Sequence, residues 1–255
     1  MRAFNAFLGK EVKEQLRNYK FLILGIVFAI VGLLSPLSAK FLPVLLENLV
    51  DDNITILLED PTYIDSWVQF FSNTNQISII VFLLLFSPIL SKEYEKGSLV
   101  HMVTKGLSRQ SIVLAKGTLL FFCWTVAYWM SGLITWGYTH YYFSDSTAEG
   151  LFLPLFSLYS FGLLLLAVLL LGAVLFNSAF APLLTVGGFV IVSFLADIVP
   201  VIHEWNPLQL ATRNTEILVL QEGDRLLAQA IGVNYLICIS LIILSIVLFR
   251  RKNIA

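Results

Sequence analysis

The sequence predicts an all-α membrane protein whose chain crosses the bilayer six times. Of its 255 residues, 58% are hydrophobic and only 13% are charged, about half the charged share of an average soluble domain. The apolar residues also gather in runs of ~20, the length that a helix needs to cross the hydrocarbon core. The net charge of −1 gives no general basic field of the kind that binds nucleic acids.

Six apolar runs fit such spans. They cover residues 21–39, 68–90, 117–139, 151–176, 179–201 and 226–249. The second contains the polar sequence 73–76, which is costly in lipid, so we expect protein or water to line it. The fourth and fifth come from one uncharged stretch, 150–196, that is too long for a single helix. Asn177 and Ser178, followed by Pro182, form the natural turn between them.

Lysine and arginine are distributed unequally across this topology. Thirteen of the 16 basic residues precede the first span, lie between the second and third, or follow the sixth, whereas 13 of the 17 acidic residues lie on the other side. The positive-inside rule therefore places both termini and the loop 91–116 in the cytoplasm. The alternative for the first run is a signal peptide cleaved near Ala39, which its length, its acidic residues and Pro36 argue against.

Residues 1–20 are predicted to form an amphipathic helix in the cytoplasmic interface of the membrane. At 100° per residue, basic side chains share one face and apolar side chains share the other. The basic residues are Lys10, Lys13, Arg17 and Lys20, and the apolar ones are Phe4, Leu8, Val12, Leu16 and Tyr19. Such a helix places cations near anionic headgroups. It is either a simple anchor or a surface that also contacts a cytoplasmic partner.

The loop 91–116 is predicted to contain a short cytoplasmic helix. Gly97 can end the preceding helix, and Ser98 can cap a new one. The apolar face of the new helix would hold Leu99, Met102 and Val103. Gly106 can end it, and Ser108 can cap the helix that becomes the third span. From spacing alone, the segment is either an ordinary connector or a lever that moves without unfolding its neighbours.

Part of this loop resembles a known family. The run Glu93-x-Glu95-x-Gly97-Ser98, with Ser108-Arg109 further on and Lys116 entering a span, is similar to ABC-2-type transporter permeases, the membrane subunits of bacterial ABC exporters. Their loop between the second and third spans carries an E-x-E-x-G-[ST] motif and a (P)-x-S-R element. The present chain has Gly106 where that family often has proline. Two further similarities are the charged segment Lys10-Glu11 with Leu16-Arg17-Asn18 before the first span and Asn206-Pro207 in the last external loop.

The resemblance implies a permease that works as a homodimer or heterodimer with two copies of a separate ABC ATP-binding subunit in a bacterial plasma membrane. It assigns coupling to that subunit to Glu93, Glu95, Gly97, Ser98, Leu99, Met102, Ser108 and Arg109, with Lys10, Lys13 and Arg17 on the interfacial helix. No G-x-x-x-x-G-K-[ST] motif occurs, so ATP and Mg²⁺ are expected on the partner, and no cofactor or metal on this chain. The expected function is export of an amphipathic peptide, antibiotic or lipid-like molecule, without an enzymatic site.

Residues 202–225 are predicted to form an external re-entrant region, with a helix that starts after Asn206-Pro207 and continues to Leu220. Asp197, near the outer end of the fifth span, either has a structural role or lines a transport pathway. The glycines of the first and fifth spans, which the resemblance places at a dimer seam, permit close helix packing. They are Gly25, Gly32, Gly187 and Gly188.

Two other functions remain open from the sequence. One is a non-transporting sensor or assembly partner of an ABC ATPase. The other is an intramembrane enzyme, which would need paired catalytic groups at one depth. His101 is expected in the cytoplasm, whereas His140 and His203 are expected outside, so the histidines do not form such a pair.

Overall fold

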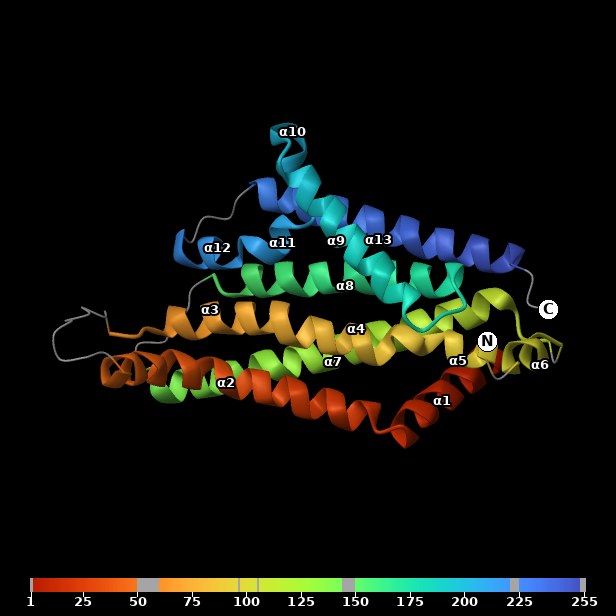
Figure 1. Cartoon of the computed structure of the whole chain (residues 1–255), viewed down its shortest axis with the longest axis horizontal. Coiled ribbons are helices and arrows are strands. Elements are labelled where there is room, and N and C mark those ends of the chain that lie inside the picture. The colour runs from red at the N-terminus through yellow and green to blue at the C-terminus, as the bar shows by residue number, and fades with distance from the viewer. Residues whose placement is uncertain are drawn as a thin grey trace.

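The apolar runs of the sequence form long helices that lie side by side along the longest axis of the molecule (Figure 1). The computed structural model describes residues 2–49, 60–95, 97–104, 106–143, 150–220 and 225–252. Within these residues every regular element is a helix. The predicted all-α class is therefore confirmed for the part of the chain that the structure describes.

The N-terminal half begins with α1 (Arg2–Arg17) and α2 (Lys20–Leu49), which are separated by a turn in which Tyr19 has a φ of 55°. The next apolar region is made of α3 (Tyr63–Asn73), the π-helical turn η1 (Thr74–Ser78), α4 (Ile79–Phe86), the 3₁₀ turn η2 (Ser87–Ile89) and α5 (Ser91–Glu95). The short α6 (Ser98–Thr104) leads to α7 (Arg109–Tyr142).

The C-terminal half consists of α8 (Phe152–Leu175), α9 (Ala181–Asp197), α10 (Pro200–His203), α11 (Gln209–Thr212), α12 (Asn214–Leu220) and α13 (Arg225–Arg251). The turn between α8 and α9 contains Asn177 and Ser178, as predicted. The prediction of a single helix from residue 207 to Leu220 is wrong, because Arg213 (φ −92°, ψ 7°) interrupts the helix between α11 and α12. The Asn214 side chain donates to the Ala211 carbonyl at 3.0 Å, a local bond that favours a turn at this position.

Five helical stretches among the described residues are long and apolar enough to cross a membrane. They are Lys20–Leu42, Tyr63–Glu95, Arg109–Tyr142, Phe152–Leu175 and Leu227–Arg251. The fifth predicted span, 179–201, contains α9, which is apolar but only 17 residues long. The helix ends because Val199 is extended before Pro200, the conformation that a following proline favours. The sixth crossing and the cytoplasmic termini stay predictions.

The polar sequence 73–76 covers the end of α3 and the first three residues of the π-helical turn η1. Asn73 donates to the Ser35 hydroxyl at 3.2 Å, and Asn75 donates to the Ala211 carbonyl at 3.0 Å. Thr74 is buried, whereas Gln76 is exposed and donates to Ser72 at 3.0 Å. Three of the four side chains therefore bond to other protein groups, which offsets the cost of placing them in an apolar segment.

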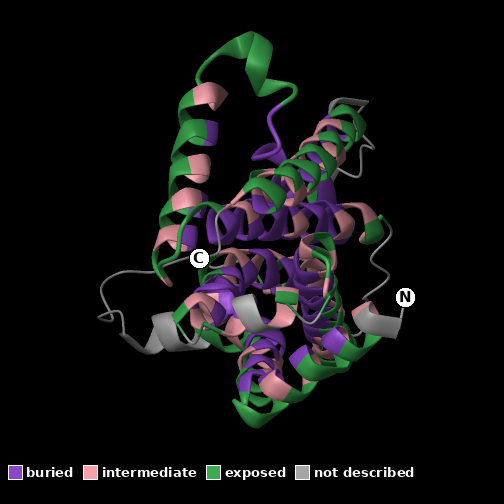
Figure 2. Ribbon diagram, turned by 90° about the vertical axis from the view of Figure 1, so that its right-hand side faces the viewer, coloured by how far each residue is buried: buried purple, intermediate pink, exposed green. Residues whose placement is uncertain are grey.

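The core is built around α8, which packs against α7, α9, α11, α12 and α13. In its most apolar window 83% of residues are buried, compared with 17% for α13. Figure 2 shows the same contrast, with buried residues in the middle of the bundle and exposed ones along outer helices. Two α7 side chains fix α8 by hydrogen bonds: Trp124 Nε1 donates to Tyr159 O at 3.1 Å, and the Tyr128 hydroxyl donates to Leu155 O at 2.8 Å.

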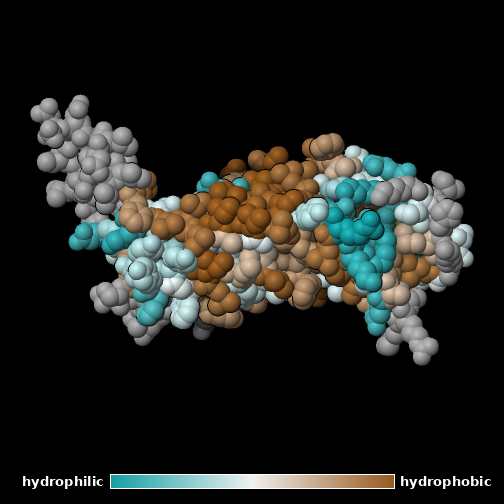
Figure 3. All heavy atoms as spheres, turned by 90° about the horizontal axis from the view of Figure 1, so that it is seen from below, coloured by the Kyte–Doolittle hydropathy of each residue, from teal (hydrophilic) through white to brown (hydrophobic). Residues whose placement is uncertain are grey.

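The face shown in Figure 3 has a wide hydrophobic zone in the middle of the long axis and hydrophilic residues toward both ends. Large apolar side chains are exposed on α2, α7, α9 and α13, including Ile26, Phe122, Ile191 and Leu236. A soluble monomer rarely exposes so continuous an apolar surface. The distribution is that of a protein whose middle is surrounded by lipid.

Close packing of α7 on α8 predicts an unequal effect of alanine at two glycines. A Cβ added at Gly162 would overlap the Trp124 ring, whereas one at Gly137 meets nothing within 4 Å. We expect Gly162→Ala to lower the free energy of unfolding by about 1–3 kcal/mol. The control Gly137→Ala should leave it unchanged or raise it by up to about 1 kcal/mol, because alanine is the better helix former. Thermal unfolding in detergent micelles measures both, and equal melting temperatures would contradict this packing.

Candidate functional site

The basic end of the molecule brings together α1, α5, α6, the start of α7 and the end of α13 (Figure 1). All residues that the sequence assigns to the coupling loop and the interfacial helix lie here. The structure adds Lys116, which becomes the centre of a buried group of charges. We call Lys10, Glu11, Glu93 and Lys116 the ion cluster.

Lys116 is the buried cation of the ion cluster. Its ammonium lies 3.0 Å from Glu11 Oε2 and 3.2 Å from Glu93 Oε2, and it donates to the Ile89 carbonyl at 2.7 Å. The side chains of Lys116 and Glu11 are 1% and 2% exposed. The amine therefore has three oxygen partners, which a buried ammonium requires.

Lys10 is the second cation and sits at the edge of the cluster. Its ammonium lies 2.9 Å from Glu11 Oε1, 3.1 Å from Glu93 Oε1 and 2.9 Å from Glu14 on the next turn of α1. Each buried carboxylate thus contacts both lysines, one through each oxygen. Because Glu11 is on α1, Glu93 on α5 and Lys116 on α7, the ion cluster joins three helices that are distant in sequence.

Opposing effects set the pKa values of the two cluster residues on α1. Burial raises the pKa of Glu11, but the charges of Lys116 and Lys10 outweigh burial and hold this pKa below its ordinary value of 4.5. Burial lowers the pKa of Lys10, but the hydrogen bonds that Lys10 donates to Glu11 and Glu14 outweigh burial and raise this pKa above its ordinary range. Both groups therefore stay charged at neutral pH.

The short helix α6 lies between two glycines with left-handed backbones, as the sequence predicts. Gly97 has a φ of 62° and Gly106 a φ of 88°, conformations that cost little only for glycine. The Ser98 hydroxyl donates to the Glu93 carbonyl at 3.4 Å. Ser108 caps α7, because its side chain accepts a hydrogen bond from Ser111 N at 3.2 Å. The predicted glycine positions and the Ser108 cap are confirmed.

The apolar face of α6 packs against the protein itself. Leu99 is 1% exposed, and Met102 and Val103 are partly buried against the same core. Glu95 and Gly97, by contrast, are exposed. Of the residues predicted to couple to a partner, Leu99 and Met102 therefore anchor the loop, and Glu95 faces outward.

Arg109 connects the coupling loop to the C-terminal helix. Its Nη1 donates to the carbonyls of Arg250 at 3.0 Å and Lys252 at 2.6 Å, which are otherwise unsatisfied at the end of α13. The Lys252 ammonium in turn donates to Val174 O at 2.6 Å and Leu175 O at 3.1 Å at the end of α8. Three long helices are therefore fastened together at this end.

The interfacial helix differs from its prediction at its C-terminal end. The placement of Lys20 on the outer basic face is wrong, because α1 ends at Arg17 and Lys20 begins α2. Lys20 is 7% exposed and donates to the Leu85 carbonyl at 2.6 Å. Leu16 and Tyr19 remain exposed, as expected for side chains that enter an interface.

A surface groove of about 850 Å³ lies between α1 and α5–α6. We call it the α1–α5 groove. Its charged lining residues are Lys10, Lys13, Glu14, Arg17, Lys92 and Glu93. Four cations and two carboxylates give it a net positive lining. Both predicted contact elements, the interfacial helix and the start of the coupling loop, therefore form opposite walls of one basic groove.

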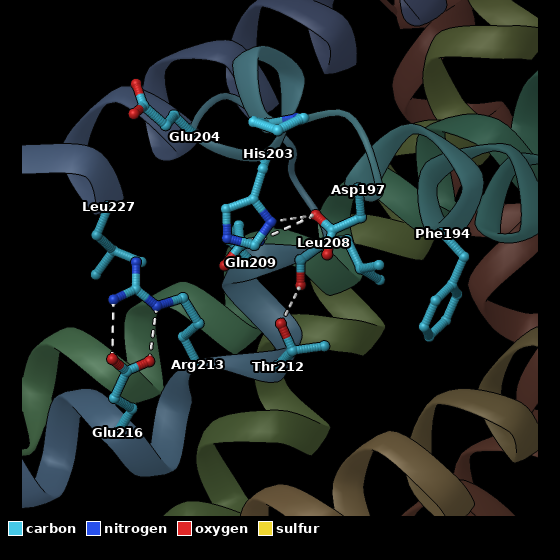
Figure 4. Close-up of a pocket in the computed structure, with 11 residues that line it drawn as sticks. Phe194, Asp197, His203, Glu204, Leu208, Gln209, Thr212, Arg213, Glu216 and Leu227 are labelled. Atoms are coloured by element: carbon cyan, nitrogen blue, oxygen red, sulfur yellow. Dashed lines mark hydrogen bonds and ion pairs between the residues drawn. The ribbon is translucent and has the colours of Figure 1, made fainter.

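Asp197 lies in a second polar group, where the end of α9 meets α10 and α11 (Figure 4). Its Oδ1 accepts hydrogen bonds from Asn206 Nδ2 at 2.8 Å and Gln209 Nε2 at 3.0 Å, and His203 Nδ1 lies 3.2 Å away. The buried Asn206 also donates to Ser193 O at 2.8 Å. These bonds hold α10 and α11 against the end of α9.

The cavity beside Asp197 has a volume of about 670 Å³. Arg213 and Glu216 line its other side and form an ion pair at 2.8 Å (Figure 4). Within the described residues, no three His, Cys, Asp or Glu side chains are arranged to hold a metal ion. Asp197 Oδ1 has three protein partners, and Asp197 also lines this cavity, so a place for it in a transport pathway stays a prediction.

The sequence singled out both Lys116 and Glu11 but did not pair them. Lys116 directly precedes the third apolar run, 117–139, where a buried cation requires a counter-charge. Glu11 was not identifiable as its partner, because the two are 105 residues apart in the chain.

Comparison with models of protein families, with curated proteins and with solved structures found no match for this chain.

The ion cluster predicts a large cost for removing its buried cation. In Lys116→Met, two buried carboxylates lose their shared partner, so we expect the free energy of unfolding to fall by about 3–5 kcal/mol. Adding Glu93→Gln should recover part of this loss, because it removes one unpaired charge. Unfolding of the wild type, the two single variants and the double variant in detergent micelles measures the coupling between Lys116 and Glu93. Lys92→Met, at the edge of the α1–α5 groove, is the control. Strictly additive effects of the two substitutions would contradict the coupling.

The lowered pKa of Glu11 predicts a specific acid sensitivity. A carboxyl whose native pKa lies below its unfolded value contributes stability above the unfolded pKa and loses it as the pH falls through the native pKa. Wild-type melting temperature should therefore fall steeply as the pH drops below 4.5. Glu11→Gln should start from a lower melting temperature at neutral pH and fall less over the same interval. Parallel curves would show that Glu11 is not ion-paired in the native state.

Proposed function

We propose that this chain is the membrane-spanning permease subunit of an ATP-driven exporter whose ATPase is a separate protein. The observation that carries the proposal is the ion cluster. It links the loop whose Glu93-x-Glu95-x-Gly97-Ser98 sequence resembles ABC-2-type permeases to the long apolar helix α7. A surface loop joined in this way to a membrane helix is what an external motor requires.

Force would pass from the partner to the spans through two charged contacts. The partner engages the exposed residues of α5 and α6, beginning with Glu95. A displacement of α5 acts on α7 through the Glu93–Lys116 contact at 3.2 Å, and on α1 through the Glu93–Lys10 contact at 3.1 Å. Gly97 and Gly106 allow α6 to change its angle without unwinding either neighbour.

The α1–α5 groove supports the same assignment through its charge. It has a net positive lining, and it lies between the two segments that resemble the coupling elements of ABC-2-type permeases. An acidic surface on the ATPase subunit would be complementary to it. ATP and Mg²⁺ are bound by that subunit in this proposal, and this end of the molecule faces the cytoplasm of a bacterial cell.

The apolar middle of the molecule supports an amphipathic substrate and a second permease subunit. Helices α2, α9 and α13 expose long apolar faces, which a lipid, a second subunit or an apolar substrate could cover. In the proposed complex two permeases form the pathway. Two ATPase subunits drive it between inward-facing and outward-facing states.

The structure determines how docking should be tested. Deleting α6 would remove the buried Leu99 and disturb the core, so charge reversal in the α1–α5 groove is the cleaner change. Affinity purification of the tagged full chain from its host should recover an ABC ATPase, identified by mass spectrometry. Lys13→Glu with Lys92→Glu should reduce that recovery about tenfold or more, because two complementary contacts become repulsive.

Lys40→Glu is the matched control, since it reverses an exposed lysine on α2 far along the chain from the groove. It should leave recovery of the ATPase unchanged. Unchanged recovery with the groove reversals, or absence of an ATPase from the wild-type preparation, would contradict the proposal. ATP-dependent flux in proteoliposomes containing both proteins distinguishes an exporter from a sensor or assembly partner.

A further inference from the structure

A second groove lies within the apolar zone, between α7, α8 and α13. It has a volume of about 350 Å³. Leu166, Ala167 and Leu170 of α8 are buried and form its floor. Its walls are Leu114, Thr118 and Phe121 of α7 on one side and Cys238, Ile239 and Ile242 of α13 on the other. We call it the α7–α13 groove.

The few polar groups of this groove already have partners. The Thr118 hydroxyl donates to the Leu114 carbonyl at 2.8 Å, and the Tyr235 hydroxyl lies 3.1 Å from the Ser160 hydroxyl. A ligand with hydrogen-bonding groups would find none to satisfy it there. The groove therefore fits a purely apolar occupant such as a hydrocarbon chain.

An exposed arginine lies beyond the end of the groove that points toward the basic end of the molecule. Arg250 lies about two turns beyond Ile242 on α13, and Arg109 lies about one turn beyond Val113 on α7. Arg109 holds the end of α13, with its Nη1 3.0 Å from the Arg250 carbonyl. The Arg250 side chain is exposed, and because Arg250 follows Ile239 by eleven residues the two share one face of α13. One exposed guanidinium group therefore lies beyond this end of the groove.

We propose that the α7–α13 groove binds one acyl chain of an anionic phospholipid, with the lipid phosphate on Arg250. The apolar floor accepts the chain, and the Arg250 guanidinium supplies the bidentate donors that suit a phosphate. A second copy of this protein fits less well, because apposing two such grooves would bring like charges together. The proposal depends on the apolar zone being in a membrane, not on the proposed transport function.

Native mass spectrometry of the full chain tests this, in detergent micelles containing equal amounts of phosphatidylglycerol and phosphatidylcholine with the same acyl chains. Wild type should retain phosphatidylglycerol preferentially. Ile239→Trp places a large side chain in the groove and should reduce retained phosphatidylglycerol about tenfold, the effect of losing burial of roughly two methylene groups. Arg250→Gln should remove the preference between the two headgroups, whereas Arg251→Gln, on the opposite face of α13, should keep it.

Leu236→Trp is the matched control, because Leu236 is on the same helix and exposed but does not line the groove. It should retain phosphatidylglycerol as wild type does. Thr118→Trp fills the groove from α7 and replaces Ile239→Trp if that variant does not fold. Equal retention by the groove-filling and control variants, equal retention of both lipids by wild type, or a dimer that forms without lipid would each overturn the proposal.

Discussion

The buried ion cluster is the constraint on which the arrangement of the basic end depends. An ammonium that is 1% exposed is tolerable only while its oxygen partners stay in place, because an unpaired buried charge costs several kcal/mol. The partners come from α1, α5 and the η2 turn, so none of these can move away from α7 independently. Hydrophobic packing would allow sliding among these elements, whereas the ion pairs fix one register.

The two polar groups of the molecule are held by different chemistry, and this affects how each can respond. At the basic end, charges join a short surface helix to a spanning helix, and a glycine with a left-handed backbone lies on each side of α6. Around Asp197, the amide groups of Asn206 and Gln209 hold the carboxylate directly, and Asn206 is itself buried. The first arrangement can pass on a displacement, and the second resists one.

Features that depend on neighbouring residues were predictable from the sequence, and those that depend on distant residues were not. The glycines around α6, the Ser108 cap and the turn at Asn177 follow from local backbone preferences, and the structure has all three. The position of Lys20 was missed because its partner, the Leu85 carbonyl, is 65 residues away. The same holds for Glu11 with Lys116. Hydropathy located five apolar helices that are long enough to span a membrane, but it carried no information about which polar groups meet between them.

The glycines of the apolar helices differ in whether a neighbouring helix packs against them. A Cβ at Gly32 would lie 2.7 Å from the Ser131 carbonyl, so this glycine serves the packing of α2 on α7 within the subunit. Gly25, Gly187 and Gly188 meet nothing within 4 Å. No neighbour within this subunit therefore requires glycine at these three positions, whereas Gly32 is already used by α7. In the proposed dimer, α9 and the Gly25 region of α2 are available to a second subunit, and the Gly32 region is not.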